Sequence, residues 1–272
     1  MKKLPQILGA DLSKSTIDLF YHGLQSHIKI KNNTAGFKEL LHWLTVQKIN
    51  LRTLVLVMEC TGLYSFHFEN FLHAQPIRFA KVNALAIKRS LGMTRGKNDK
   101  IDAQRIARYG VEKFDTLSFQ TPQDPSLQRL QLLHNTRERL VKHRASLICA
   151  VKEYRVVLKE TDPIIRSQLT LIKDFTRQIK AMDQAIQKQV SESGEEVRHN
   201  FDLLTSIKGV GKVVATATII KTKNFTSFKN GRKFSCYCGA APFEHSSGTS
   251  IRKKTRVSHL ADKTMKTLLT QS

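Results

Sequence analysis

The sequence predicts an α/β N-terminal domain, a helical middle segment and a small, mostly α-helical C-terminal domain. Three observations lead to this prediction. Short apolar runs of strand type alternate with helical patterns in the first 115 residues. Apolar residues then recur every seven positions, and near the C-terminus two helical runs flank a glycine-containing turn. We therefore expect three segments, which span residues 1–115, 120–195 and 200–272.

The N-terminal segment is predicted to have the element order βββαβαβα. Residues 6–12, 16–23 and 26–32 show β-type patterns separated by turn formers such as Ser13 and Gly23, which predicts a three-strand meander. The elements expected after it are a helix over 36–47, a buried strand over 53–60, a helix over 63–74, a strand over 77–83, and helices over 83–92 and 99–110. This order is typical of a mixed sheet covered by helices, in which we expect the first and fourth strands to be neighbours.

Two apolar stripes of heptad spacing mark the middle segment. The stripe residues are Leu133, Leu140, Leu147 and Tyr154 before Pro163, and Ile165, Ile172, Ile179 and Ile186 after it, with Phe175 and Met182 at the complementary position. The pattern favours either an antiparallel helical hairpin or a dimerising coiled coil. Gln168 and Gln189 at inner positions weaken a long regular coiled coil. We expect self-association through residues 127–190, giving a homodimer or a homotetramer.

Gly209-Val210-Gly211 lies between two helical runs of the C-terminal segment. One interpretation is a helix-hairpin-helix element, in which Gly209 and Gly211 let backbone N–H groups approach a phosphate while Lys208 and Lys212 add positive charge. The other interpretation is a plain helix–helix turn. A dinucleotide fingerprint is excluded, because a third glycine is missing and no strand precedes the turn.

The charge balance indicates a polyanionic partner. The chain has 45 Lys and Arg residues against 22 Asp and Glu residues, a formal net charge of +23 at pH 7. Nucleic acid is therefore the expected partner, bound with a steep salt dependence. A membrane-surface protein is disfavoured because no lipidation motif or apolar span of membrane length is present. A signal peptide is not expected either, because Asp11 interrupts the N-terminal apolar run before an h-region can form.

Four scattered cysteines fit a reducing compartment better than a disulfide framework. Cys236 and Cys238 could bind zinc together with His245, but their spacing is wrong for a zinc knuckle. We therefore do not expect a zinc site.

Four carboxylates are the candidate chemical site of this basic chain. Asp11 and Glu59 end two strands expected to be neighbours, and Asp99 and Asp102 share one face at the start of a helix. An alternative is that Asp99 and Asp102 have no chemical role and only stabilise the first turn of the helix, with Lys97, Lys100 and Arg105 as counterions. Carboxylates that converge repel one another unless a cation lies between them. We therefore expect one or two Mg²⁺ ions, which prefer oxygen ligands and polarise phosphate oxygens.

These residues resemble those of the DEDD transposases of insertion sequences and of the pilin-gene invertases related to them. The matching segments are GADLSKSTIDLF, MECTGLY, VNALAIK, KNDKIDAQRIA, LLTSIKGVGKVVATA, FSCYCGAAP and HSSGTSIRKKTRVS. The resemblance implies a RuvC-like (RNase H-like) N-terminal domain and a C-terminal transposase domain that exchange strands of donor and target DNA. It implies Mg²⁺ bound by Asp11, Glu59, Asp99 and Asp102, a structured guide RNA, and a bacterial cytoplasmic, nucleoid-associated protein.

The resemblance also implies a covalent serine nucleophile, for which Ser247 is the best match. Ser247 precedes Gly248, whose freedom at positive φ permits a tight turn that exposes the serine hydroxyl, whereas Ser246 would be a hydrogen-bonding neighbour. The basic run after it is expected to contact nucleic acid and consists of Arg252, Lys253, Lys254 and Arg256. From the residues alone, a phosphate-binding turn in a basic loop is the other interpretation.

Two departures from the family pattern affect what is expected. Relatives more often have threonine before the first aspartate of KNDKIDA, and this chain ends at Ser272, within a helix that relatives usually continue. We therefore expect a shortened C-terminal domain. The rival functions are a RuvC-like nuclease that uses metal-bound water, and a non-catalytic nucleic-acid-binding protein.

Overall fold

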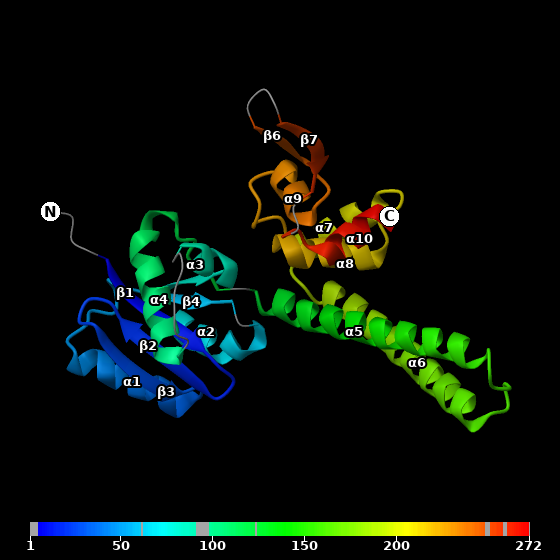
Figure 1. The fold of residues 1–272 in the computed structure, drawn as a ribbon, viewed down its shortest axis with the longest axis horizontal. Coiled ribbons are helices and arrows are strands. Elements are labelled where there is room, and N and C mark those ends of the chain that lie inside the picture. Colours follow the sequence, from blue (N-terminus) through cyan, green and yellow to red (C-terminus); the bar gives the residue numbers. More distant parts are fainter. Residues whose placement is uncertain are drawn as a thin grey trace. The chain divides into compact units, whose positions relative to one another are not determined.

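The computed structural model describes residues 5–60, 62–90, 98–122, 124–247, 251–257 and 260–271. For residues 243–247, 251–254 and 256 this description covers the backbone only. The chain forms two compact units, Met1–Pro122 and Gln123–Ser272 (Figure 1). Each unit has its own hydrophobic core.

The first unit is built on a mixed five-stranded sheet. Its strands are β1 (Gln6–Leu12), β2 (Thr16–Tyr21), β3 (Ser26–Lys31), β4 (Leu54–Glu59) and β5 (Arg78–Val82). Their order in the sheet is β3-β2-β1-β4-β5. The first three strands pair antiparallel, and β4 pairs parallel to both β1 and β5. The predicted meander and the predicted pairing of the first and fourth strands are therefore confirmed.

Helices cover both faces of this sheet (Figure 1). They are α1 (Thr34–Val46), the 3₁₀ helix η1 (Gly62–Ser65), α2 (Phe66–His73), α3 (Ala84–Ser90), α4 (Asp99–Glu112) and the 3₁₀ helix η2 (Phe114–Thr116). α1 and α2 bury Phe37, Leu40, Phe68 and Leu72 against one face. α3 and α4 bury their apolar residues against the opposite face.

Glycine allows α4 to lie directly on β1. A Cβ atom added to Gly9 would lie 2.3 Å from the Ala103 carbonyl oxygen and 2.4 Å from the Ala107 backbone nitrogen. Real Cβ atoms do not come this close to backbone atoms, so any other residue at this position would push the helix away. Gly110 has a similar role in the following turn of the helix, because a Cβ there would lie 2.8 Å from the Cγ2 atom of Val57.

Two long helices, α5 (Pro125–Tyr154) and α6 (Pro163–Ser191), begin the second unit and lie side by side as a hairpin (Figure 1). Both start in the same way. The side chain of Asp124 or Asp162 accepts a hydrogen bond from the backbone N–H two residues on, and proline occupies the first helical turn. Of the two arrangements that the heptad pattern favoured, the hairpin within one chain is present.

The rest of the second unit is organised around one buried helix. Its elements are α7 (Glu195–Ser206), α8 (Lys212–Thr222), α9 (Gly231–Cys238), β6 (Phe243–Ser247), β7 (Ile251–Arg256) and α10 (Lys263–Gln271). Residues 214–220 of α8 are all buried, against α5, α6 and α7 on one side and against α9 and α10 on the other. The sequence of α8 therefore does not show apolar residues on one face only, with a period of 3.6 residues. A helix that is surrounded by protein needs no polar face.

One feature of this unit was not predicted from the sequence. β6 and β7 form an antiparallel hairpin, whereas a basic loop was one interpretation of the segment around HSSGTSIRKKTR. The Arg, Lys and Thr residues of IRKKTR suit a two-stranded ribbon as well as a loop, so composition alone did not distinguish the two. Within the described residues, no helix is long and apolar enough to cross a membrane.

Candidate active site

The acidic residues of the sheet lie on the face that α4 covers. Side chains alternate along a strand, so Asp11 lies on the same face as Ile7 and Gly9, and Glu59 on the same face as Val57. Both carboxylates are at the carboxyl ends of parallel neighbouring strands, where they meet at one edge. The structure thus places two of the four predicted acidic residues as expected.

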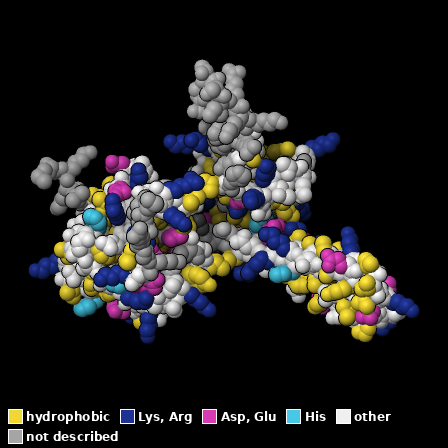
Figure 2. Space-filling model, viewed as in Figure 1, with side chains coloured by type: hydrophobic (Ala, Val, Ile, Leu, Met, Phe, Trp, Pro, Cys, Tyr) yellow, Lys and Arg dark blue, Asp and Glu magenta, His cyan; other side chains and the backbone are white. Residues whose placement is uncertain are grey.

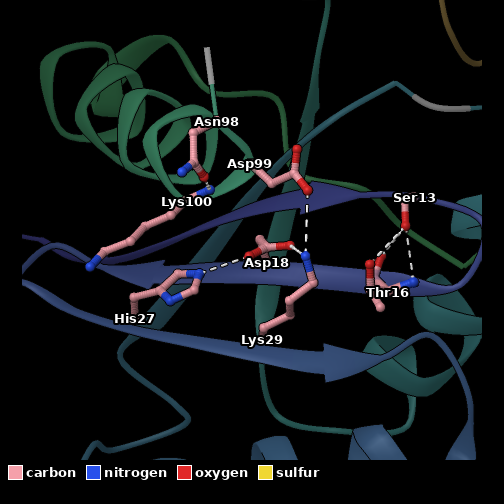
Figure 3. Close-up of polar contacts among 8 residues, drawn as sticks. All are labelled: Ser13, Thr16, Asp18, His27, Lys29, Asn98, Asp99 and Lys100. Carbon is pink, nitrogen blue, oxygen red and sulfur yellow. Dashed lines mark hydrogen bonds and ion pairs between the residues drawn. The ribbon is translucent and has the colours of Figure 1, made fainter. Parts of the chain in front are cut away.

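Asp99 and Asp102 lie in the first turn of α4, which packs on β1. The helix starts at Asn98, whose side-chain oxygen accepts a hydrogen bond from the Lys100 N–H at 2.9 Å (Figure 3). The close contact of Ala103 with Gly9 fixes the height of the helix over the sheet. Asp102, one residue before Ala103, is therefore held near the end of β1.

The pKa of Asp11 shows that these carboxylates interact. Partial burial and the negative charges of Asp102, Asp99, Glu59 and Asp18, in that order of effect, raise the pKa of the Asp11 carboxyl to about 6. The other three predicted acidic residues thus lie within electrostatic reach of Asp11. Such a cluster is unfavourable without a cation.

Asp18 is a fifth acidic residue, which the sequence did not single out. It lies directly opposite Asp11 in the β1–β2 pairing, and Lys29 of β3 lies directly opposite Asp18. Lys29 Nζ is 3.0 Å from Asp18 Oδ2 and 3.4 Å from Asp99 Oδ2, and His27 Nε2 is 2.9 Å from Asp18 Oδ1 (Figure 3). Lys29 therefore links the sheet to the first residue of α4. Asp18 is buried, with only 4% of its surface exposed, and the contacts with Lys29 and His27 offset the cost of burying its carboxylate.

The turn between β1 and β2 keeps Asp11 and Asp18 in register. Ser13 donates its backbone N–H to the Thr16 carbonyl oxygen at 2.8 Å. The Thr16 N–H donates to Ser13 Oγ at 2.9 Å (Figure 3). In an antiparallel pair, a slip of one residue would move one of the two aspartates to the other face. The serine side chain thus helps to fix the geometry of the acidic cluster.

Basic side chains contact both aspartates of α4 in this arrangement. Arg105 Nη1 is 2.9 Å from Asp102 Oδ1, as the plain interpretation of this helix start expected, and Lys29 rather than Lys100 approaches Asp99. Lys97 lies outside the described residues. Among the described residues, no three Asp, Glu, His or Cys side chains are close enough together to share one metal ion.

The chemistry of the cluster still fits a divalent cation. Its members offer carboxylate oxygens, the ligands that Mg²⁺ and similar hard ions prefer. Burial first, and then the neighbouring negative charges, raise the pKa of Asp11, and a bound divalent ion would favour its charged form.

Ser247 is the last residue of β6, in the second unit. In the pairing of β6 with β7 it lies opposite Ile251, while Ser246 lies opposite Arg252. The predicted basic residues Arg252, Lys253, Lys254 and Arg256 all belong to β7. Gly248, on which the choice of Ser247 over Ser246 partly rested, lies outside the described residues.

The glycine-containing turn connects α7 to α8. Gly209 has a φ of 94°, a conformation that favours glycine, and Gly211 is the N-cap residue of α8 with no side-chain cap. Lys208 and Lys212 are both exposed beside it. The turn joins two helices, as both interpretations of the sequence required.

The described cysteines do not favour zinc. Cys238 is fully buried in the apolar cluster of α8, α9 and α10, and burial together with the nearby Asp262 raises the pKa of its thiol to about 11. A protonated thiol is a poor metal ligand. The side chain of His245 lies outside the described residues.

Sequence reasoning missed Asp18, His27 and Lys29. A signal was present, because the alternation of TIDLF places Asp18 on the same face as Phe20. Only the register between strands shows that this face is also the face of Asp11. Register depends on the turn at residues 12–15, and the sequence indicated only that a turn is present.

Comparisons with known proteins agree with this organisation. Residues 9–163 match the model of DEDD transposases of the IS110 type, and residues 201–272 match the model of the transposase IS116/IS110/IS902 family. The chain is 30% identical to the pilin gene-inverting protein of Moraxella bovis over 274 residues, which cover 96% of this chain and 80% of that protein. It is 26% identical to the transposase for insertion sequence element IS1111A of Coxiella burnetii over 265 residues, which cover 89% and 70% of the two chains.

Proposed function

This chain belongs to the IS110 family of DEDD transposases, and on that premise we propose that it cleaves and exchanges DNA strands with a carboxylate-bound Mg²⁺ ion and a serine nucleophile. The observation that carries the metal part of this proposal is the position of Asp11 and Glu59 at the carboxyl ends of neighbouring parallel strands, with Asp99 and Asp102 in the first turn of the helix that packs on β1. A divalent ion held by these carboxylates would polarise the scissile phosphate and assist phosphodiester cleavage.

Asp11, Glu59, Asp99 and Asp102 are the proposed metal ligands. A bound divalent ion would stabilise the negative charge that develops on the phosphate oxygens during transfer. The mixed sheet with β1 and β4 as central neighbours is compatible with an RNase H-like domain. Lys29 and Arg105 act as counterions of Asp99 and Asp102 in the protein without metal.

Ser247 is the proposed nucleophile. Its Oγ would attack the scissile phosphorus and lose its proton, while the bond from phosphorus to the leaving deoxyribose oxygen breaks and that oxygen takes up a proton. The resulting phosphoserine ester conserves the phosphodiester bond for rejoining to another strand. Attack by water would discard it. Exchange of DNA strands between donor and target therefore favours a covalent serine step over hydrolysis.

Nucleic acid is the proposed partner of both units. Lys and Arg side chains are spread over the visible face of both units (Figure 2). In the second unit we propose two contact regions, the turn that holds Lys208, Gly209, Gly211 and Lys212, and the basic strand β7. A structured guide RNA that selects the DNA sites is proposed from the family resemblance.

The α5–α6 hairpin is proposed to pair subunits into a dimer or a tetramer. Val156 and Val157, in the connection between the two helices, are 83% and 78% exposed. Apolar side chains also cover much of this end of the hairpin in Figure 2. Exposed apolar patches of this kind are typical of interaction surfaces.

A denaturing gel tests the proposed reaction. The purified chain is incubated with Mg²⁺, co-purified RNA and radiolabelled duplex DNA that carries the ends of its element. We expect a labelled species that migrates with the protein and disappears after protease treatment. Cleavage without this adduct would indicate a metal-dependent nuclease, and binding without cleavage would indicate a nucleic-acid-binding protein.

A further inference from the structure

A groove in the second unit lies where α5, α6 and the beginning of α8 meet. Its volume is about 570 Å³, within the usual range of small-molecule sites. Ile186 of α6 and Val213 of α8 give it apolar walls. Among the described residues, its lining comes from α5, α6, Gly211 and the beginning of α8.

Three positively charged side chains line this groove, one from each helix. They are Arg137 of α5, Lys180 of α6 and Lys212 of α8. One carboxylate, Asp183, also lines it and accepts a hydrogen bond from Arg137 Nε. The lining therefore has an excess of positive charge, which favours an anionic ligand.

The N-terminus of α8 adds to this preference. Gly211 and Lys212 line the groove, and no side chain caps the helix at Gly211. The first backbone N–H groups of an α-helix have no acceptor within the helix, so they can bind an anion. A Cβ added to Gly211 would meet no atom within 4 Å, so the approach to these N–H groups is open.

A buried histidine gives the second, independent indication of a ligand. His134 lines the groove, is only 4% exposed, and its Nδ1 has no hydrogen-bond partner among the described residues. Burial lowers the pKa of His134, so its ring is neutral at pH 7. A neutral ring offers one donor and one acceptor, whereas a buried ring nitrogen without a partner costs stability.

We propose that this groove binds a single unstacked nucleotide of a nucleic-acid strand, with the base between the apolar walls near His134 and the phosphate at Lys180, Lys212 and the start of α8. The proposal rests on the nucleic-acid-binding function proposed above and extends the nucleic-acid surface onto the two long helices. A bare phosphate would leave most of the volume of about 570 Å³ empty. Bases that are out of the stack are commonly held against apolar side chains and hydrogen-bonded at their edges.

Calorimetric titration of the full chain with AMP, dAMP and inorganic phosphate at constant ionic strength tests the proposal. We expect both nucleotides to bind at least about tenfold more tightly than phosphate, because only they fill the apolar region of the groove. Lys180→Gln should weaken nucleotide binding by about threefold to tenfold, the usual effect of losing one charged contact. Lys180 is exposed, so this change should not disturb folding.

Lys173→Gln is the matched control, because Lys173 is exposed on the same helix two turns earlier and does not line the groove. It should change nucleotide binding by less than about twofold. Gly211→Phe, which places a large side chain in the open approach, should also reduce binding. Phosphate that binds as tightly as AMP, or equal losses in the two lysine variants, would overturn the proposal.

Photo-crosslinking identifies the polymer. Single-stranded RNA with 4-thiouridine and single-stranded DNA with 4-thiothymidine are irradiated with the full chain, and the crosslinked peptides are mapped. Crosslinks near His134 or Lys180 with one polymer identify it as the source of the nucleotide, and none with either would overturn the proposal. A chain that forms the covalent DNA adduct without binding nucleotides would refute this inference alone, whereas nucleotide binding without an adduct would refute only the proposed reaction.

Discussion

Replacing Asp11 by asparagine should stabilise the first unit when metal is absent. Asp11→Asn keeps the shape of the side chain and removes the charge that Asp102, Asp99 and Glu59 oppose. In most proteins, loss of a partly buried polar group that fits its site is destabilising. An increase in stability on replacing Asp11 would therefore identify a site whose geometry serves binding rather than stability.

The magnitude follows from the pKa of Asp11, which rises from 3.8 to about 6 on folding. Each pKa unit corresponds to about 1.4 kcal/mol, and partial exposure reduces the effect, which leaves roughly 1–2 kcal/mol. Between pH 4 and 6 the folded state binds more protons than the unfolded state, so the stability of the wild type falls as the pH rises through this range. The destabilisation caused by the charged Asp11 carboxylate is fully present above pH 6 and vanishes below pH 4.

Urea unfolding in EDTA, followed by the fluorescence of Trp43, measures this effect. Trp43 is the chain's single tryptophan and packs against the core of the first unit. At pH 8 we expect Asp11→Asn to be more stable than the wild type by roughly 1–2 kcal/mol, and at pH 4 to be equal to it. Added Mg²⁺ should stabilise the wild type more than the variant. A variant that is less stable at pH 8, or a difference that does not depend on pH, would refute the reasoning.

Three further predictions concern the metal site, the nucleophile and the hairpin. Lys29→Met removes a cation from the acidic cluster and should tighten Mn²⁺ binding in calorimetry by roughly fivefold, whereas Lys38→Met on the opposite face should not; weaker binding would contradict the role of Lys29 as a competing cation. Ser247→Ala should eliminate the covalent DNA adduct on a denaturing gel, and Ser246→Ala should retain much of it; an adduct peptide that maps to Ser246 would reverse the assignment. Sedimentation should show a dimer or a larger assembly that Val157→Glu dissociates, and a wild type that is monomeric at all concentrations would exclude pairing through the hairpin.

The sequence predicted the first unit well because its signals are local. The run from Leu54 to Met58 is apolar throughout, which is typical of a strand covered on both faces, and it forms most of β4. The start of α4 at Asp99 was indicated by the acidic first turn, and the structure adds Asn98 as its capping residue. The position of Asp11 and Glu59 at one edge then follows from parallel pairing.

Other features depend on contacts between distant residues and had no local signal. Nothing in the sequence around Lys29 shows that it bridges Asp18 and Asp99, which is 70 residues away. The heptad pattern could not distinguish pairing within one chain from pairing between chains, because both bury the same stripe. The β6–β7 hairpin was missed because two strands rich in basic and hydroxyl residues lack an apolar face.

Strand cleavage by Asp102→Asn tests the central claim, that the four carboxylates form one metal site for DNA cleavage. The variant, the wild type and Asp115→Asn, an exposed acidic residue of the same unit, are compared on the same labelled DNA with Mg²⁺. We expect Asp102→Asn to lose cleavage by roughly a hundredfold or more, while its affinity for RNA stays within about twofold, because one carboxylate matters little to a chain with 45 basic residues. Asp115→Asn should cleave like the wild type. Cleavage by Asp102→Asn at the rate of the wild type would contradict the account.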